Sequence, residues 1–174
     1  MSQVEAFPPI AENDARLLVL GSAPGIASLQ ADFYYAHPRN AFWPIMMELT
    51  GELIAAQSQP ALNRARRQLL INNQVALWDV LASCQRPGSL DSAIVRGSEQ
   101  VNDFGGFLLA HRSIEAIACN GQAAFKLFKS RVLGEIQFAK DLIVLPSTSP
   151  ANARMTLAQK TDHWRRALSP WLPG

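Results

Sequence analysis

The sequence is poor in cysteine and has no long apolar segment. Its two cysteines, Cys84 and Cys119, lie far apart and in no metal-binding spacing, which argues against a disulfide framework and a cysteine-built metal site. We expect both to be buried thiols. No apolar run approaches the roughly 20 residues of a membrane span, and the beginning of the chain lacks the basic and then apolar pattern of a signal peptide. These absences favour a cytoplasmic protein without a metal or a membrane partner.

Charged residues are also few. They make up 17% of the chain and the net charge is +2 at pH 7, so nucleic-acid binding is permitted but not required. Hydrophobic residues make up 48%, which is typical of a folded globular protein. With 174 residues, the chain is long enough for one core and too short for two ordinary domains. We therefore expect a single domain over residues 1–174.

Strand and helix patterns alternate along the chain. Four short apolar runs predict buried parallel strands at Leu17–Leu20, Val75–Trp78, Ile114–Cys119 and Leu142–Leu145. Stretches with helical spacing begin near Ala41, Pro60, Asn102, Gly121 and Asn152. The alternation predicts a layered α/β domain, with a short helix in the loop-rich tract 83–102. In such folds, ligands bind beyond the carboxyl ends of the strands.

Two tracts follow expected strands at that edge. They are GSAPG at 21–25 and PSTSPAN at 146–152. Neither is a nucleotide signature, because a phosphate loop needs Gly in place of Ile26, followed by Lys, and a dinucleotide motif needs Gly in place of Ala23. A functional turn and a plain strand-to-helix connection both fit this composition.

A third tract, YYAHPRNAFW at 34–43, holds four aromatic rings, a histidine, an arginine and an asparagine directly before a helix. One interpretation is structural: Asn40 caps the helix that begins at Ala41. The other is functional: the rings stack on a planar ligand, Arg39 contacts a phosphate, and Asn40 orients a water molecule or a base edge. The sequence leaves both open.

These three tracts, in this order, resemble the uracil-DNA glycosylase superfamily, and HPRNAFW resembles its hypoxanthine-DNA glycosylase branch. The resemblance covers nearly the whole chain. It implies a three-layer α/β/α fold with a central four-stranded parallel sheet. It also implies a DNA repair enzyme without a cofactor, which flips a deaminated base, chiefly hypoxanthine, out of DNA and hydrolyses its N-glycosidic bond. The implied partner is DNA containing deaminated bases, and we expect a monomer that associates with the nucleoid when bound to DNA.

Departures from the family pattern sharpen the catalytic assignment. Many uracil-cleaving relatives have Asp or Asn where this chain has Ala23, so the resemblance places the water-positioning role on Asn40. They also commonly carry a histidine in the second motif, where this chain has Ser147, Thr148 and Ser149. This difference argues against efficient uracil excision, which stays the alternative within the family. Superfamily members with an iron-sulfur cluster hold it with four cysteines. This chain has two cysteines, so no cluster is expected.

Base recognition is expected at the strand ends. Phe42 is the first choice for stacking on the base, with Tyr34 or Tyr35 as alternatives. Asp79 and Asn120 each follow a strand and are expected to contact the base, although a helix cap and a turn would also explain them. The expected base-binding residues are Gly21, Ser22, Ala23, Phe42, Asp79, Asn120 and Ser147.

DNA contacts are expected from the turns and from a basic segment. Residues 152–166 carry four basic side chains and one acid. Arg154 is expected to contact a phosphate or to fill the space that the flipped base leaves, whereas Lys160 and Arg166 are expected on a solvated helix face. The expected DNA-binding residues are Pro24, Gly25, Arg39, Thr148, Ser149, Pro150, Asn152 and Arg154.

The same residues also bear on other function classes. A Ser-His-Asp hydrolase is disfavoured, because Ser22 does not lie in the Gly-x-Ser-x-Gly turn and Asp162 points away from the neighbouring His163 on a helix. A catalytically silent module that binds damaged DNA through the same pocket stays open.

Overall fold

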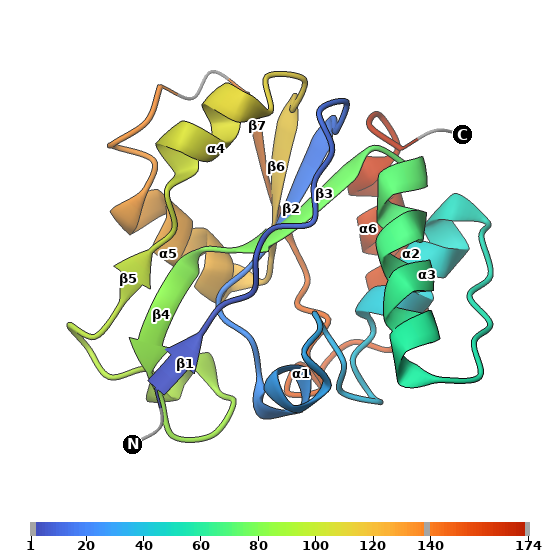
Figure 1. The fold of residues 1–174 in the computed structure, drawn as a ribbon, viewed down its shortest axis with the longest axis horizontal. Coiled ribbons are helices and arrows are strands. Elements are labelled where there is room, and N and C mark those ends of the chain that lie inside the picture. Colours follow the sequence, from blue (N-terminus) through green and yellow to red (C-terminus); the bar gives the residue numbers. More distant parts are fainter. Residues whose placement is uncertain (1–2, 138–139, 173–174) are drawn as a thin grey trace.

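The computed structural model describes residues 3–137 and 140–172. Its centre is a four-stranded parallel sheet in the order β3-β2-β6-β7, and the strands are Val75–Asp79, Leu17–Gly21, Ala116–Asn120 and Asp141–Leu145 (Figure 1). The expected sheet is confirmed, with β2, β3 and β6 each running one residue further than predicted. The register pairs Gly21 with Asp79 and Leu20 with Cys119. Gly21, Asp79 and Asn120 therefore lie together at the carboxyl edge.

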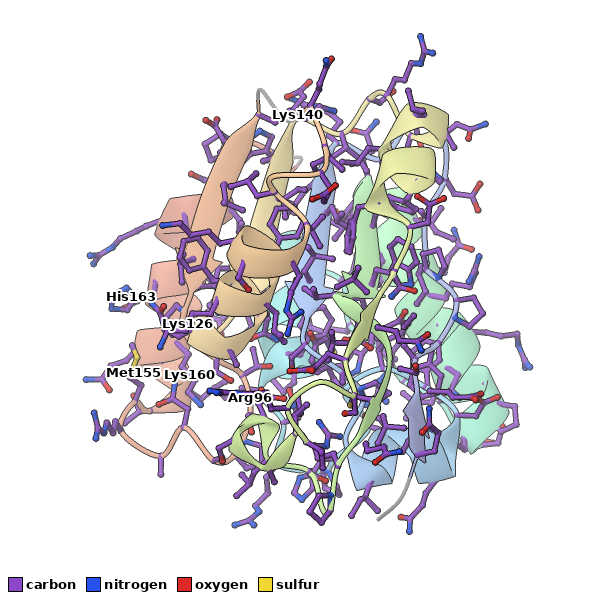
Figure 2. All side chains as sticks on the ribbon, turned by 90° about the vertical axis from the view of Figure 1, so that its left-hand side faces the viewer. Arg96, Lys126, Lys140, Met155, Lys160 and His163 are labelled. Carbon is purple, nitrogen blue, oxygen red and sulfur yellow. The ribbon has the colours of Figure 1, made fainter. Side chains whose placement is uncertain are left out.

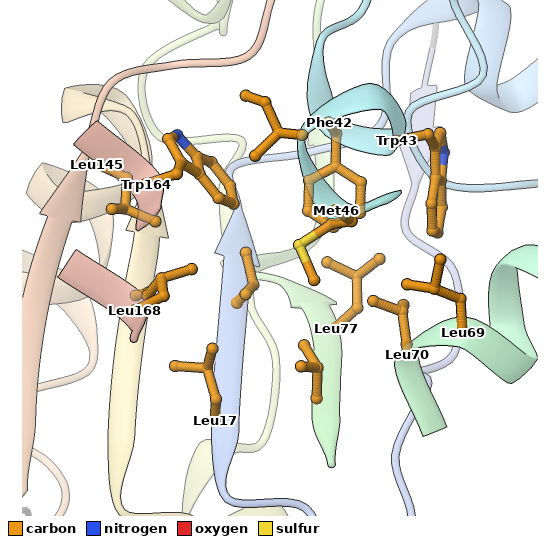
Figure 3. Packing of buried hydrophobic residues seen from close by; sticks show 14 of the residues in the cluster. Leu17, Phe42, Trp43, Met46, Leu69, Leu70, Leu77, Leu145, Trp164 and Leu168 are labelled. Atoms are coloured by element: carbon orange, nitrogen blue, oxygen red, sulfur yellow. The ribbon is translucent and has the colours of Figure 1, made fainter. Parts of the chain in front are cut away.

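Side chains of the sheet alternate between two layers of helices. In β2, Leu17 and Val19 pack in one core cluster and Leu18 and Leu20 in the other. The first cluster contains α2 (Phe42–Thr50), α3 (Gln59–Asn72) and α6 (Leu157–Leu168), and the second contains α4 (Phe104–Ala110) and α5 (Gln122–Arg131). Figure 3 shows the first cluster, in which Phe42 and Trp164 lie above the sheet. The three-layer α/β/α fold is confirmed.

One expectation about the strands is wrong. β7 is not buried along its length, since Leu145 is its one fully buried residue and Val144 is 36% exposed. The reason is its place at the edge of the sheet. β3 lies at the other edge and is buried throughout, because the chain before β2 covers it and Ile10 pairs with Leu77.

The sequence patterns missed several short elements. A second, antiparallel sheet consists of β1 (Gln3–Glu5), β4 (Leu81–Gln85) and β5 (Gln100–Val101), and α1 (Ile26–Ala31) follows the first motif. β4 begins two residues after the end of β3, so the two strands share one apolar run. The short helix expected within 83–102 is present as a single 3₁₀ turn, Asp91–Ala93.

Both cysteines are buried and form no disulfide, as expected. In residues 3–137 and 140–172, no helix has the length and apolar character to cross a membrane.

Helix α6 begins at Leu157 and not near Asn152, because a capping box fixes its start. The Thr156 hydroxyl accepts a hydrogen bond from the Gln159 amide (3.2 Å), and the Gln159 side chain accepts one from the Thr156 amide (2.9 Å). These bonds satisfy two amides that the helix itself leaves unpaired.

We predict that Thr156→Ala lowers the free energy of unfolding by about 1 kcal/mol, measured by urea denaturation. Thr156→Ser keeps the accepting hydroxyl and should retain most of that stability. An equal loss in both variants would contradict the capping role.

Candidate active site

A cavity of about 150 Å³ lies at the carboxyl edge of the parallel sheet. A cavity of roughly this volume in another protein holds one benzene molecule, so the space suits a single planar ring system. The turns after β2 and β7 form its rim together with α1 and the segment before α2, at the lower end of the molecule in Figure 1.

Most of the residues expected from the sequence do line this cavity. They are Gly21, Ser22, Ala23, Pro24, Gly25, Asn40, Asp79, Asn120, Ser147, Thr148, Ser149 and Pro150. Tyr34 and Tyr35 line it as well, and so does His37. The three tracts singled out in the sequence therefore meet around one cavity.

Gly21 provides the close packing at one wall. A Cβ atom on Gly21 would collide with Oδ1 of Asp79 and would lie 2.8 Å from the Tyr35 hydroxyl. The Tyr35 backbone has φ +51°, a conformation that costs energy for a residue with a large side chain. Backbone strain of this kind gathers at functional sites, where the surrounding structure holds it in place.

Asp79 is the ionisable group that the parallel sheet buries at the cavity. The residue is 3% exposed, and its Oδ2 atom makes no hydrogen bond within the described part of the chain. Burial, and then the negative charge of Asp91, raise the pKa of the Asp79 carboxyl to about 7, while the positive charge of Arg86 opposes the rise. Near neutral pH, the cavity therefore holds a carboxyl group that is close to its midpoint of protonation.

Burial, followed by the charge of Asp79, also raises the pKa of the Tyr35 hydroxyl, and the Asn120 side chain acts in the opposite direction. Tyr35 is therefore an un-ionised phenol in this site. Its oxygen is buried and forms no hydrogen bond of good geometry with the described residues.

Asn40 has a fixed side chain between the cavity and a neighbouring groove. Its Oδ1 accepts a hydrogen bond from the Phe42 backbone amide (3.0 Å), and the backbone amide of Asn40 donates to the His37 carbonyl (2.9 Å). The helix cap proper is Ala41, so the expected cap at Asn40 is wrong by one residue. The Asn40 side chain still stabilises the first turn of α2 through this hydrogen bond to the Phe42 amide. The structural and functional interpretations of Asn40 are thus compatible.

The loop after β7 is held in place from several sides. Asn120 and Thr148 form a pair of hydrogen bonds, from Asn120 Nδ2 to Thr148 Oγ1 (2.8 Å) and from the Thr148 amide to Asn120 Oδ1 (2.9 Å). The Thr148 carbonyl accepts from the Ala41 amide (3.0 Å), and the Pro146 carbonyl accepts from the Trp164 indole (2.9 Å). The loop therefore has a defined position beside Asn40. The Thr148 side chain is 1% exposed, so it serves the loop and not a surface contact.

Phe42 does not line the cavity, and its place corrects the expected base-stacking surface. The ring is fully buried in the core, 4.3 Å from the Tyr35 ring and 5.9 Å from the Trp164 ring between centroids. These neighbours enclose the Phe42 ring within the core. Of the aromatic residues proposed for stacking, Tyr34 and Tyr35 are those that border the cavity.

A second groove adjoins the cavity and shares Asn40 and Pro150 with it. Arg39 and Asn152 line this groove, as does Lys160. Lys160 is not on a solvated face as expected: it is 5% exposed and donates to the Ser149 carbonyl (3.4 Å). Figure 2 shows Met155 and Lys160 together at the end of the molecule where the strands end. Arg154 is exposed beside this groove.

One wall of the cavity, from the tract 83–102, was not expected from the sequence. Ser89 and Asp91 line the cavity, and Asp91 Oδ1 accepts a hydrogen bond from the Ser22 hydroxyl (2.6 Å). Arg86 is 1% exposed; it donates to the carbonyls of Pro24 and Gly88 and lies 3.5 Å from Asp91. An arginine and an aspartate in a turn-rich tract give no periodic signal, so only the fold reveals their place. Within residues 3–137 and 140–172, no three His, Cys, Asp or Glu side chains gather as a metal site would require.

We predict that Gly21→Ala destabilises the protein by roughly 1–3 kcal/mol in urea denaturation, because the new methyl group must displace Asp79 and Tyr35. Gly134→Ala is the matched control, since nothing lies within 4 Å of its added Cβ and the change should stay within about 0.5 kcal/mol. Equal stability of the two variants would show that the wall at Gly21 is not tightly packed.

Comparisons with known proteins identify the family of the chain. The model of the Uracil DNA glycosylase superfamily matches residues 8–172. The chain is 31% identical over 156 residues to a hypoxanthine DNA glycosylase of Methanosarcina acetivorans, covering 90% of this chain and 92% of the relative. It is 28% identical over 164 residues to a hypoxanthine DNA glycosylase of Methanosarcina barkeri, covering 94% and 97%. The solution NMR structure of a candidate uracil DNA glycosylase from Methanosarcina acetivorans superposes with a TM-score of 0.75 at 27% identity, covering 95% of this chain and 98% of that one.

Proposed function

Because the chain belongs to the uracil DNA glycosylase superfamily, we propose that it is a DNA glycosylase that releases hypoxanthine from deoxyinosine in DNA. The observation that carries the proposal is the position of Asn40, whose side chain is fixed on the rim of a cavity of single-base size. The names of the two relatives support hypoxanthine as the base. We expect it to act as a single-domain monomer.

The reaction needs a positioned water molecule and fixed donors around the departing base. As the bond between C1′ and the base breaks, positive charge develops on the sugar and negative charge on the base. The water oxygen forms a new bond to C1′, one of its protons ends on the released base, and the DNA keeps an abasic site. Asn40 Oδ1, held by the Phe42 amide at 3.0 Å, accepts a hydrogen bond from that water. A neutral amide is a weak base, so its role is to orient the water.

The size of the cavity requires the base to leave the duplex. Extrusion costs a few kcal/mol and least for a mispaired base such as hypoxanthine, so mispairing contributes to selectivity. Stacking on Tyr35 or Tyr34 offsets part of that cost. Phe42 then acts indirectly, since its ring at 4.3 Å supports the Tyr35 ring. Asp79 contacts the base, and Asn120 positions the Thr148 loop around it.

The phosphate backbone fits the groove beside the cavity. Arg39 and Asn152 line it, and Arg154 is exposed next to it, so two cations and one neutral donor face the path of a strand whose nucleotide enters the cavity. Phosphate contacts of this kind fix the register of the DNA without reading its sequence.

We predict that Asn40→Ala lowers the single-turnover rate of hypoxanthine release by at least about 100-fold, because the water loses its positioned acceptor. The measurement uses duplexes with one hypoxanthine or one uracil, followed by alkaline cleavage of abasic sites. Asn72→Ala, an exposed asparagine on α3, is the control and should keep the wild-type rate.

Different outcomes separate the alternatives. Cleavage at uracil but not at hypoxanthine would overturn the proposed substrate. Tight binding of both duplexes without any base release would show that the protein is a catalytically silent module that binds damaged DNA. Full activity in Asn40→Ala would show that another group positions the attacking water.

A second prediction concerns DNA affinity. Arg154→Ala should weaken binding of all duplexes alike and lower the slope of log K against log salt by about 1, as expected for one lost phosphate contact. Arg112→Ala is the control, because Arg112 precedes β6 at the opposite end of the sheet and should leave the slope unchanged. Equal slopes in wild type and Arg154→Ala would show that Arg154 makes no phosphate contact.

A further inference from the structure

The Asp79 carboxyl group and the Tyr35 hydroxyl differ from the other polar groups of the cavity discussed above, because each has a buried oxygen without a hydrogen-bond partner among the described residues. The Ser22 hydroxyl donates a hydrogen bond to Asp91, and the Asn120 side chain donates one to Thr148. Asp79 Oδ2, in contrast, is buried and has no hydrogen-bond partner in the described part of the chain. Buried polar atoms without a partner are rare and costly in native proteins, and at a cavity wall a ligand is the natural partner.

We infer that Asp79 meets the base as a neutral carboxylic acid, accepting a hydrogen bond from the N1–H of hypoxanthine and donating its own proton to the keto oxygen O6. This inference rests on the proposed function and specifies how that site recognises its substrate.

The surroundings of Asp79 favour the neutral form. The burial of the carboxyl, and then the negative charge of Asp91, raise the pKa of Asp79 to about 7, and Arg86 counters only part of this effect. The other titratable groups that interact with it are the hydroxyls of Tyr34 and Tyr35 and the thiol of Cys84, all of which are uncharged at neutral pH because burial raises their pKa values. Bringing a base into the cavity removes further water, which disfavours the charged carboxylate still more.

The two protonation states differ in what they offer a base. A carboxylic acid presents one donor and one acceptor side by side, which matches an N–H group next to a carbonyl. A carboxylate presents acceptors alone, so its oxygen lone pairs would repel the lone pairs of the O6 atom. The difference grows during the reaction, because negative charge moves onto the departing base and is shared with O6. A donor at O6 stabilises that charge, whereas a carboxylate there opposes it.

The test is the pH dependence of single-turnover base release at saturating enzyme. Wild type should lose activity above a midpoint of about pH 7 or higher, by about tenfold for each pH unit, as expected for one required proton. Asp79→Asn replaces the acid by an amide that donates at every pH. Its rate should therefore stay level from pH 7 to 9 and exceed the wild-type rate at pH 9.

The matched control is Asp91→Asn, which removes the neighbouring charge. Since that charge raises the pKa of Asp79, the variant should keep the fall in rate but shift its midpoint to lower pH. A readout without catalysis comes from the ¹³C shift of the Asp79 carboxyl in the wild-type protein, which should titrate near pH 7 and not near its ordinary value of about 4.

The outcomes separate the inference from the proposed function. If wild type releases no base at any pH, the proposed function is overturned and the inference with it. If wild type releases base with a level profile, or if Asp79→Asn falls as wild type does, the neutral-acid role alone is overturned. A carboxyl that titrates near pH 4 overturns it as well, even if Asp79→Asn does not fold.

Discussion

The register of the parallel sheet is the constraint on which the site depends. Pairing of β2 with β3 sets Gly21 opposite Asp79, and the absence of a side chain at Gly21 lets Asp79 and Tyr35 approach the same point. A shift of one residue would turn each side chain of β3 to the opposite layer of helices. The buried carboxyl and its close approach to Tyr35 at Gly21 therefore depend on one set of backbone hydrogen bonds.

The loops around the cavity are anchored by hydrogen bonds between distant parts of the chain. Asn120 at the end of β6 holds Thr148, and the Thr148 carbonyl binds the first turn of α2 next to Asn40. Arg86 holds the turn after β2 through Pro24. Each loop is thus fixed by a neighbouring element, which keeps the proposed water-orienting amide and the base-contacting carboxyl in constant relative positions before DNA arrives. Pre-organisation of this kind lowers the cost of reaching the transition state.

The sequence predicted the parallel sheet and the meeting of three motifs because both depend on local patterns. Apolar runs mark strands wherever both faces are covered, and ligand sites of open parallel sheets lie at the carboxyl edge. It could not reveal that Phe42 belongs to the core, since an aromatic residue next to a helix start looks the same in either place. Nor could it place Ser89 and Asp91 at the cavity, because their approach depends on the short antiparallel sheet that folds the tract 83–102 back.

The most direct test of the account is mass spectrometry of the products after incubating a hypoxanthine-containing duplex in ¹⁸O-labelled water. We expect unlabelled free hypoxanthine and a full-length strand that carries an abasic site labelled at the sugar, because water attacks C1′ and the base departs intact. An intact duplex, or label in the released base, would contradict the central claim that this cavity holds a flipped base for hydrolysis of its glycosidic bond.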